Sequence, residues 1–255
     1  MARSIRRDII EMAYSSSAPH VGSALSCADI LTVLYSGILK LDPWDSRDKF
    51  ILSKAHASTA LYAALAAKGI MHRDLLATYC KPGGCLPAHL DMTVAPGIEC
   101  SAGSLGHGFN IGLGMAYGFK QQRSARRVYA LVGDGETQEG SIWEGALFAP
   151  TMGLDNFTAI IDCNNLQGYG RPTEVCSFEP VAEKWRAFGW QVCEADGHDH
   201  GALLAAFAED SCGRPKVVVA RTIKGKGVSF MENELIWHYY IVTAEHRARA
   251  LEEIG

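Results

Sequence analysis

The sequence predicts an α/β protein built on a doubly wound, mostly parallel sheet with helices on both faces. Apolar runs such as VYALV, FTAII and KVVVA recur along the second half of the chain and are separated by helical stretches. These runs lack the polar alternation of a half-exposed strand, which is typical of parallel strands buried on both sides. The chain has 255 residues, 48% hydrophobic and 20% charged, enough to bury a core without disulfides or structural metals.

The first part of the chain is predicted to be mainly helical. Apolar residues recur at helical spacing from Ser4 to Tyr14 and again from Cys27 to Lys40, which indicates two helices. The segment SSSAPHVGSAL between them is expected to be a loop. A short strand, FILS, follows, and then an Ala- and Leu-rich helix that ends at Gly69, because glycine tolerates the left-handed conformation at a helix end.

Residues 81 to 108 are rich in Gly and Pro and have no sustained period, so we expect a long loop there. Long loops in compact domains often carry function. The helix that follows, FNIGLGMAYGFKQQ, contains Gly112, Gly114 and Gly118, which lower helix propensity unless another element packs closely on them. We therefore expect this helix to be tightly packed.

Strands and helices alternate over the rest of the chain. The predicted strands are VYALVGDG, FTAIIDCN, WQVCEADG and KVVVARTIKG, and the predicted helices are EGSIWEGALFAPTMGL and GALLAAFAED. Helical crossovers between buried strands produce a parallel sheet.

Charge and cysteine content exclude several classes of protein. Lys and Arg number 24 against 28 Asp and Glu, so the chain offers no broad basic surface for nucleic acid or an acidic membrane. Neither an apolar targeting core nor a run of ~18 apolar residues is found in the sequence. The eight cysteines form no CxxC pair, which fits free thiols better than a zinc site, and we expect a cytoplasmic protein.

Two polar clusters follow predicted strands directly, GDGETQEG after VYALV and DCNNLQGYG after FTAII. Open α/β sheets bind ligands at the carboxyl ends of their strands. The Asp134 carboxylate, the Asn164 amide oxygen and a loop carbonyl would form an oxygen-only set suited to Mg²⁺ or Ca²⁺. Gly133 and Gly135 would let the backbone approach an anion. The alternative is that GDG is a turn and the Asn residues are caps.

These clusters and their surroundings resemble the thiamine diphosphate motif, and the chain resembles transketolase in particular. The resemblance runs in order through APHVGSALSCADIL, DKFILSKAHAS, LPAHLD, PGIECSAGSLGHG, VGDGETQEGSIWEGA, IDCNNLQ and KGKGVSFMENELIWH. It covers the amino-terminal third of a transketolase. Residues 1 to 255 would then be a single diphosphate-binding domain, with the pyrimidine-binding and carboxy-terminal domains on a separate subunit.

The resemblance implies where thiamine diphosphate and its metal bind. Asp134, Asn164 and the backbone carbonyl of Leu166 would ligate Mg²⁺, for which Ca²⁺ can substitute. Gly133 would donate its N–H to the diphosphate. The full set of implied cofactor-binding residues is His56, Gly103, Leu105, Gly106, Gly133, Asp134, Gly135, Asn164 and His238.

Four histidines, His20, His56, His89 and His238, fall at positions that are functional in the family. Ketol transfer must protonate an alkoxide and deprotonate a hydroxyl, and imidazole titrates near the working pH. A lone histidine would more often be structural, and His72 and His107 are expected to be so. These four are the expected catalytic histidines.

Glu139 and Glu144 are expected in the helix after GDG and match family glutamates at the subunit interface near the cofactor. Glu139 is therefore also counted as catalytic, and an exposed helix face is the alternative for both. The pair Lys224 and Lys226 is expected in a solvated turn, although KGKG precedes His238 and could position it.

Some residues depart from the family pattern. Ala55 stands where Gly usually precedes the histidine, Leu90 where Pro often follows, and Tyr239 and Tyr240 where Gly commonly follows WH. The aromatic pair could reshape the donor site. A modified or non-phosphorylated sugar is therefore an alternative donor to the usual sugar phosphates.

The sequence thus predicts the amino-terminal subunit of a thiamine diphosphate-dependent transketolase that moves a two-carbon ketol unit from a ketose, phosphorylated or not, to an aldose. It should act only with a carboxy-terminal partner, as a heterotetramer around a homodimer core. One alternative is a subunit of another thiamine enzyme, resembling 1-deoxyxylulose-phosphate synthase or decarboxylating 2-oxo acids. Another is a non-catalytic nucleotide-binding module, against which the lack of GxGxxG counts.

Overall fold

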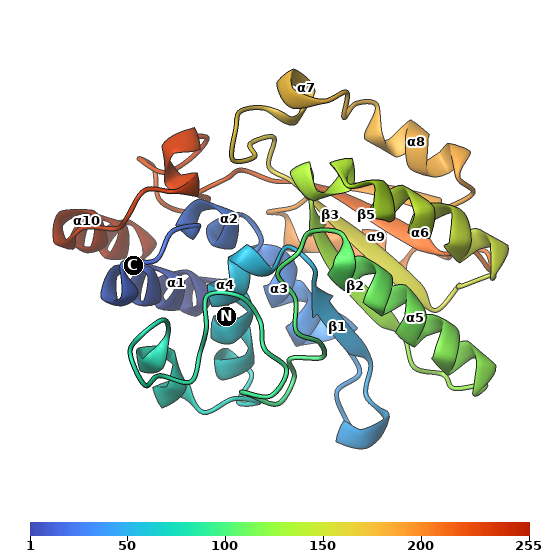
Figure 1. Cartoon of the computed structure of the whole chain (residues 1–255), viewed down its shortest axis with the longest axis horizontal. Coiled ribbons are helices and arrows are strands. Elements are labelled where there is room, and N and C mark those ends of the chain that lie inside the picture. The colour runs from blue at the N-terminus through green and yellow to red at the C-terminus, as the bar shows by residue number, and fades with distance from the viewer.

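A five-stranded parallel sheet runs through the molecule, which confirms the predicted fold class (Figure 1). The computed structural model describes all residues from 1 to 255. The strand order is β1-β2-β3-β5-β4, so the chain crosses over between β3 and β4 and returns with β5. The strands are β1 (Lys49–Leu52), β2 (Val128–Gly133), β3 (Phe157–Cys163), β4 (Gln191–Asp196) and β5 (Lys216–Arg221).

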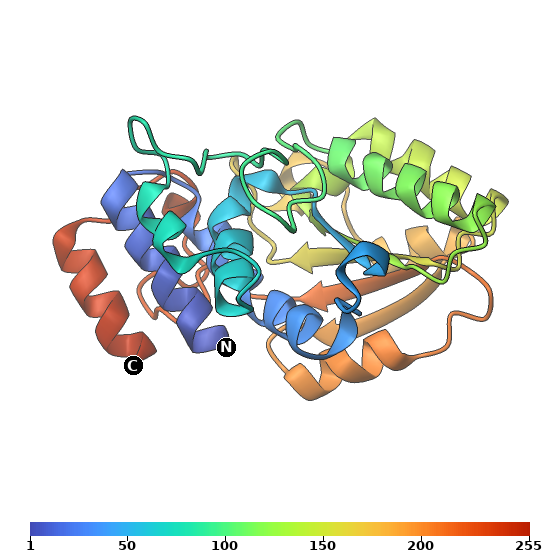
Figure 2. The same ribbon diagram turned by 90° about the horizontal axis from the view of Figure 1, so that it is seen from below.

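Helices cover both faces of the sheet (Figure 2). On one face lie α5 (His107–Gln121) and α6 (Gly140–Thr151), and on the other α3 (Ala28–Val33) and α9 (His200–Ala208). Every residue of β2 and β3 is buried, as their unbroken apolar sequences require, whereas β4 at the edge alternates between buried and exposed positions. The polar residues that follow β2 and β3 are therefore held at fixed positions by a rigid core.

A group of helices packs beside β1 and contains both ends of the chain. It consists of α1 (Ala2–Ser16), α2 (Val21–Ser26), α4 (Ser58–Ala67) and α10 (Ala244–Ile254), and the N and C marks lie close together there in both ribbon views. Helix α1 packs against α4 and α10. The carboxy-terminal segment is thereby fixed on the helices that precede β1.

The structure differs from the sequence prediction mainly in short helices. The predicted loop SSSAPHVGSAL contains α2, whose six residues are all buried. The second predicted helix is shorter than residues 27 to 40, because α3 passes into a π-helical turn from Leu34 to Ile38. Helices α7 (Pro172–Val175), α8 (Val181–Ala187) and α10 were not predicted. The long loop ends where α5 begins at His107, and Gly69 has the expected positive φ of 75°.

Helix α5 is tightly packed on its inner side only. A Cβ on Gly112 would stand 3.1 Å from the Phe157 ring and 3.2 Å from Ile51, so a larger residue would push the helix off the sheet. The prediction of close packing is wrong for Gly114 and Gly118, which have no neighbour within 4 Å. These two glycines leave an open strip on the outer face of α5.

None of the helices is both long and apolar enough to cross a membrane. All eight cysteines are free thiols, and Cys27, Cys100, Cys163 and Cys193 are buried.

Candidate active site

The carboxyl ends of β2 and β3 form the floor of a cavity of about 520 Å³. Gly133 pairs with Asp162 in the sheet register, so Asp134 leaves β2 directly beside the end of β3. Asp134 is buried, and its carboxylate accepts hydrogen bonds from the N–H groups of Gly135 at 2.7 Å and Asn165 at 2.6 Å. The two polar clusters of the sequence therefore meet at one place.

The oxygen atoms on this floor fit a divalent cation. Burial and the neighbouring charge of Asp162 raise the pKa of Asp134 to about 6, as expected of a buried carboxylate without a cationic partner. Asn164 and Leu166 line the same cavity. The structure contains no cluster of three or more acidic, histidine or cysteine side chains suited to a metal ion. A cation here would need the amide and carbonyl oxygens and the oxygens of its own ligand.

The rim of the floor also fits an anion. Gly135 has no room for a side chain, because a Cβ there would lie 2.4 Å from Oε1 of Gln167. The other end of that amide, Nε2 of Gln167, is buried without a hydrogen-bond partner, although the residue lines the cavity. A buried donor without a partner is costly, and an anion oxygen in the cavity would satisfy it. Gly103 and Leu105 line the same cavity.

Several of the expected diphosphate and metal contacts already have partners within the chain, among them the Asn164 amide oxygen, which accepts from the Leu166 N–H at 3.1 Å. The N–H of Gly133 donates to Oε2 of Glu136 at 3.1 Å, and its donation to a diphosphate stays a prediction. The carbonyl of Leu166 accepts a hydrogen bond from Nζ of Lys224 at 3.0 Å. A carbonyl oxygen has a second lone pair, so Leu166 can still ligate a metal.

Glu136, which sequence reasoning missed, connects three parts of the site. Its buried carboxylate accepts hydrogen bonds from the Ser53 hydroxyl after β1, from the Gly106 N–H before α5 and from the Gly133 N–H. Gly106 has a positive φ of 80°, and a Cβ there would stand 2.4 Å from Oγ of Ser141. Glu136 thus fixes the loop that carries Gly103 and Gly106 against the GDG turn. The only sequence signal for it is its position directly after GDG.

A buried ion pair supports the floor from below. Nζ of Lys54 contacts the carboxylate of Asp162, and the two side chains are 1% and 0% exposed. The other oxygen of Asp162 accepts from the Thr222 hydroxyl, and Lys54 also donates to the carbonyl of Ser23 at 2.9 Å. Burial alone would raise the pKa of Asp162, but the charge of Lys54 and its hydrogen bonds outweigh burial and hold that pKa below its ordinary value.

We expect Lys54→Met to lower the free energy of unfolding by about 3–5 kcal/mol, because it leaves the Asp162 charge buried and unpaired. Urea denaturation measures this loss. The matched control is Lys120→Met, which removes a half-exposed pair with Asp155 and should cost less than about 1 kcal/mol. Equal losses of unfolding free energy in the two variants would contradict the conclusion that Lys54 compensates a buried charge on Asp162.

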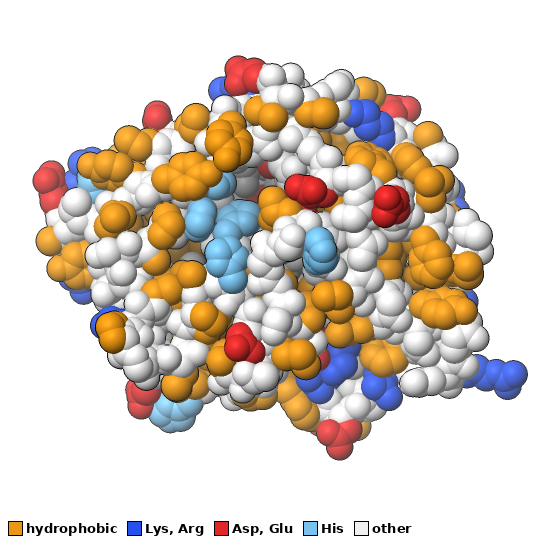
Figure 3. Space-filling view, in the orientation of Figure 1, with side chains coloured by type: hydrophobic (Ala, Val, Ile, Leu, Met, Phe, Trp, Pro, Cys, Tyr) orange, Lys and Arg blue, Asp and Glu red, His pale blue; other side chains and the backbone are white.

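Three of the four predicted histidines form one cluster over this floor. The ring centroids of His20, His56 and His238 lie 5.1 to 5.8 Å apart. The backbone N–H of His20 donates to the backbone carbonyl of His238 at 3.0 Å, which connects the start of α2 to the segment after β5. Figure 3 shows histidine side chains gathered at the edge of a hollow on this face.

His89 lines the same cavity from the long loop. Its ring lies against Gly103, where a Cβ would stand 3.5 Å from the imidazole. The neighbouring Leu90 is buried and pairs with Ala102 in an isolated antiparallel bridge, which closes this part of the loop. Leu90 therefore holds the loop in shape at one of the positions that depart from the family pattern.

The clustered histidines are neutral, which corrects the expectation that they titrate near the working pH. Burial and the charge of Lys224 lower the pKa of His238 to about 3. Burial, with His89 and Lys224, lowers the pKa of His20 to about 4, and burial lowers that of His56 well below its ordinary value. In this neutral form each imidazole has one nitrogen that donates a hydrogen bond and one that can accept a hydrogen bond or a proton.

Lys224 determines which nitrogen of His238 carries the proton. Its Nζ lies 2.9 Å from Nδ1 of His238, and because an ammonium group only donates, Nδ1 accepts and the proton sits on Nε2. Lys224 is 1% exposed, so the expectation of a solvated turn is wrong for it. Lys226 does face solvent in part and pairs with Glu232.

Glu139 and Glu144 are placed differently from one another. Glu139 precedes α6 with extended backbone (ψ 132°) and lines the cavity, so the expectation that it lies within the helix is wrong. Glu144 lies within α6 and outside the cavity. Both side chains are exposed in this single chain.

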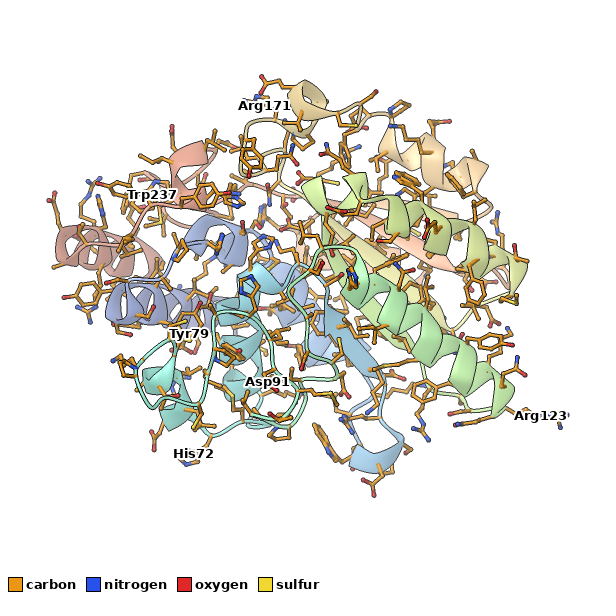
Figure 4. All side chains as sticks on the ribbon, viewed as in Figure 1. His72, Tyr79, Asp91, Arg123, Arg171 and Trp237 are labelled. Atoms are coloured by element: carbon orange, nitrogen blue, oxygen red, sulfur yellow. The ribbon has the colours of Figure 1, made fainter.

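His72 and His107 lie outside the cavity. His72 stands at the periphery, labelled in Figure 4, with its side chain 78% exposed. His107 is exposed at the first residue of α5. Neither contacts the histidine cluster.

Comparison with known proteins gives consistent similarities over the whole chain. Residues 1–250 match the family described as "Transketolase, thiamine diphosphate binding domain". The chain is 40% identical to the 6-deoxy-6-sulfo-D-fructose transketolase subunit SqwG of Clostridium sp. (strain MSTE9), over 99% of this chain and 94% of that protein. It is also 40% identical to one subunit of the apulose-4-phosphate transketolase of Phocaeicola vulgatus, over 98% and 91% of the two chains.

Among solved structures, the transketolase from Leishmania mexicana superposes with a TM-score of 0.91 at 27% identity. All of this chain is covered, but only 40% of that transketolase. The chain therefore spans less than half the length of the single-chain enzyme.

Proposed function

Because the chain belongs to the transketolase family and matches its thiamine diphosphate-binding domain, we propose that it is the amino-terminal subunit of a split transketolase. With a second polypeptide it would transfer a two-carbon ketol unit from a ketose donor to an aldose acceptor. The observation that carries this proposal is the joint placement of the Asp134, Asn164 and Leu166 oxygens and a cluster of three histidines around one cavity.

We propose that Asp134, Asn164 and Leu166 hold Mg²⁺, or Ca²⁺ in its place, and that the cation binds the diphosphate. The protein carries a formal charge of -4, so a divalent cation is needed to compensate an anionic cofactor at a buried carboxylate. Gln167 would donate its unpaired amide N–H to a phosphate oxygen. The loop residues Gly103 and Leu105 would close the cofactor from the opposite side.

When bound, thiamine diphosphate supplies the nucleophilic carbon that breaks and forms the carbon–carbon bonds, and the protein supplies orientation and proton transfer. His238 would present its Nε2–H to a sugar oxygen, because Lys224 occupies its Nδ1. His20 and His56, neutral and adjacent, would accept a proton from a sugar hydroxyl or return it. His89 would bind hydroxyl groups nearer the mouth of the cavity.

We propose that two copies of the chain form a homodimer core and that two partner subunits complete a heterotetramer. The outer faces of α5 and α6 and the residue after α6 expose Ile111, Tyr117, Leu147, Phe148 and Met152, which is unusual for a surface facing water. Orange side chains mark this region on the right of Figure 3. Glu139 and Glu144 lie on or beside the same face, so a second copy would bury both carboxylates next to the cofactor site.

The partner would be the polypeptide that carries the pyrimidine-binding and carboxy-terminal domains. The cavity floor offers oxygen and amide groups for a diphosphate and a metal, and the chain covers only 40% of a solved single-chain transketolase, so the contacts to the aminopyrimidine would come from the partner. The cofactor would thus be held between two polypeptides. We also propose a cytoplasmic location, because eight free cysteines fit a reducing compartment.

The names of the similar proteins indicate a class of donor substrate and argue against the alternative functions. Two relatives are named for a sulfonated and a phosphorylated ketose, and we propose a modified ketose of this kind as the donor. Membership of the family argues against the nucleotide-binding alternative. The names of the relatives favour ketol transfer over 2-oxo acid decarboxylation or a deoxyxylulose-phosphate-type synthesis.

The test is the reaction catalysed by the reconstituted complex. The chain is mixed with the partner polypeptide, sought first in the neighbouring gene, together with Mg²⁺ and thiamine diphosphate. We expect mass spectrometry to find a donor shortened by two carbons and an acceptor lengthened by two. Condensation of pyruvate with an aldehyde, or decarboxylation of a 2-oxo acid without ketol transfer, would contradict the proposal.

A further inference from the structure

A second hollow, of about 460 Å³, lies directly outside the site cavity and is lined mainly by apolar side chains. Leu235, Ile236 and Tyr240 form its walls. Gly168 and Tyr239 line both the hollow and the site cavity, and no other residue does so. Tyr239 and Gly168 therefore separate the two spaces.

The contacts of Tyr239 place its ring at the boundary between the site cavity and the outer hollow, which is here called the mouth of the site. The ring centroid lies 4.6 Å from that of His238 and 5.9 Å from that of His20. Its hydroxyl reaches the opposite loop, where a Cβ on Gly168 would stand only 2.5 Å away. The side chain thus spans from the histidine cluster to the loop after β3, and Gly168 leaves room for its tip.

We propose that Tyr239 is a specificity-determining residue that limits the length of the sugar chain this enzyme accepts. The inference rests on the proposed ketol transfer. The diphosphate end of the cofactor would lie on the floor at Asp134, and the histidines line the same cavity. A sugar whose reacting carbonyl lies at the histidines would extend its far carbons past Tyr239, whose ring centroid lies 4.6 Å from that of His238.

The mouth favours short acceptors for a steric reason. Tyr239 lies at the boundary between the site cavity and the apolar hollow, so a longer carbon chain that extends toward the hollow would meet its ring. Lys54 is the only Lys or Arg that lines the site cavity, and it is buried in its pair with Asp162. This chain therefore discriminates by size, and a cation that binds the sulfonate or phosphate of the proposed donor would come from the partner subunit.

The adjacent Tyr240 provides a matched control. It has the same side chain and a similar exposure, 45% against 55% for Tyr239, but it lines only the outer hollow. Its ring packs on Trp237, labelled in Figure 4, and on His246, at centroid distances of 5.4 and 5.8 Å. A change at Tyr240 disturbs the same loop without opening the site.

The experiment uses the reconstituted complex with hydroxypyruvate as donor and two acceptors, glycolaldehyde and ribose 5-phosphate. The measured quantity is the ratio of kcat/KM for ribose 5-phosphate to that for glycolaldehyde. We expect Tyr239→Ala to raise this ratio about tenfold or more, the scale of discrimination by pocket size. Tyr240→Ala should leave the ratio unchanged.

A ratio that stays within about twofold of the wild type in Tyr239→Ala would overturn the proposal, and so would an equal rise in Tyr240→Ala. Tyr239 is exposed, so its truncation leaves the core intact, and melting temperatures check this. Lack of any ketol transfer by the wild-type complex would sink the proposed function and this inference together. Transfer with an unaltered ratio would sink the role of Tyr239 alone.

Discussion

Asp134→Ala is expected to abolish Mg²⁺-dependent binding of thiamine diphosphate. It removes the only carboxylate among the three proposed metal ligands and leaves the charge of the diphosphate uncompensated in a buried site. An unpaired buried charge costs roughly 3–5 kcal/mol, so the affinity should fall at least ~100-fold. Isothermal calorimetry on the assembled complex, with and without Mg²⁺, measures the change.

The matched control for this variant is Asp155→Ala. Asp155 precedes β3 at the opposite end of the strand and forms a half-exposed pair with Lys120, so its loss should not change cofactor affinity. Circular dichroism establishes that both variants are folded. Unchanged affinity in a folded Asp134→Ala complex would refute the metal site.

His56→Ala and His238→Ala are expected to lower turnover by roughly 10²- to 10⁴-fold, the usual effect of losing a group that transfers protons. Neither ring is part of the apolar core, so both variants should fold. Steady-state kinetics of the complex with saturating cofactor gives kcat. Wild-type turnover in either variant would assign that histidine a structural role.

The tautomer of His238 gives a sharper version of this test. Because its proton lies on Nε2, a glutamine amide can replace the donor, whereas an asparagine amide is too short to reach the same position. We expect His238→Gln to retain more activity than His238→Asn. His72→Ala, far from the cavity and exposed, is the control that should change nothing. A better asparagine variant would contradict the role of Lys224 in fixing the proton.

The sheet could be predicted from the sequence because its central strands are continuous apolar runs that no other element explains. Helix α2 could not, since Pro19, Gly22 and several serines give its segment the composition of a loop. Burial of all six α2 residues and the hydrogen bond from His20 to His238 stabilise it. Both depend on contacts with distant parts of the chain.

The functional site, like the fold, could be predicted only in part from the sequence. Asp134 and Asn164 could be paired from the sequence because each follows a buried strand and adjacent parallel strands end at one edge of a sheet. The buried state of Lys54, Asp162 and Glu136 could not, because charged residues are almost always exposed and sequence alone does not identify the exceptions. Lys54 and Asp162 lie 108 residues apart. Their pairing follows only from the order of the strands.

We propose that one half of the cofactor site lies on this chain and the other half on a partner subunit. The most direct measurement is the affinity for thiamine diphosphate and Mg²⁺, followed together with ketol transfer, for the chain alone and after titration with the partner subunit. We expect weak binding and no transfer by the chain alone, and a joint rise of affinity and activity that saturates at equal amounts of the two chains, because each completes the site of the other. Full ketol transfer by this chain alone would contradict a cofactor site that is divided between two chains.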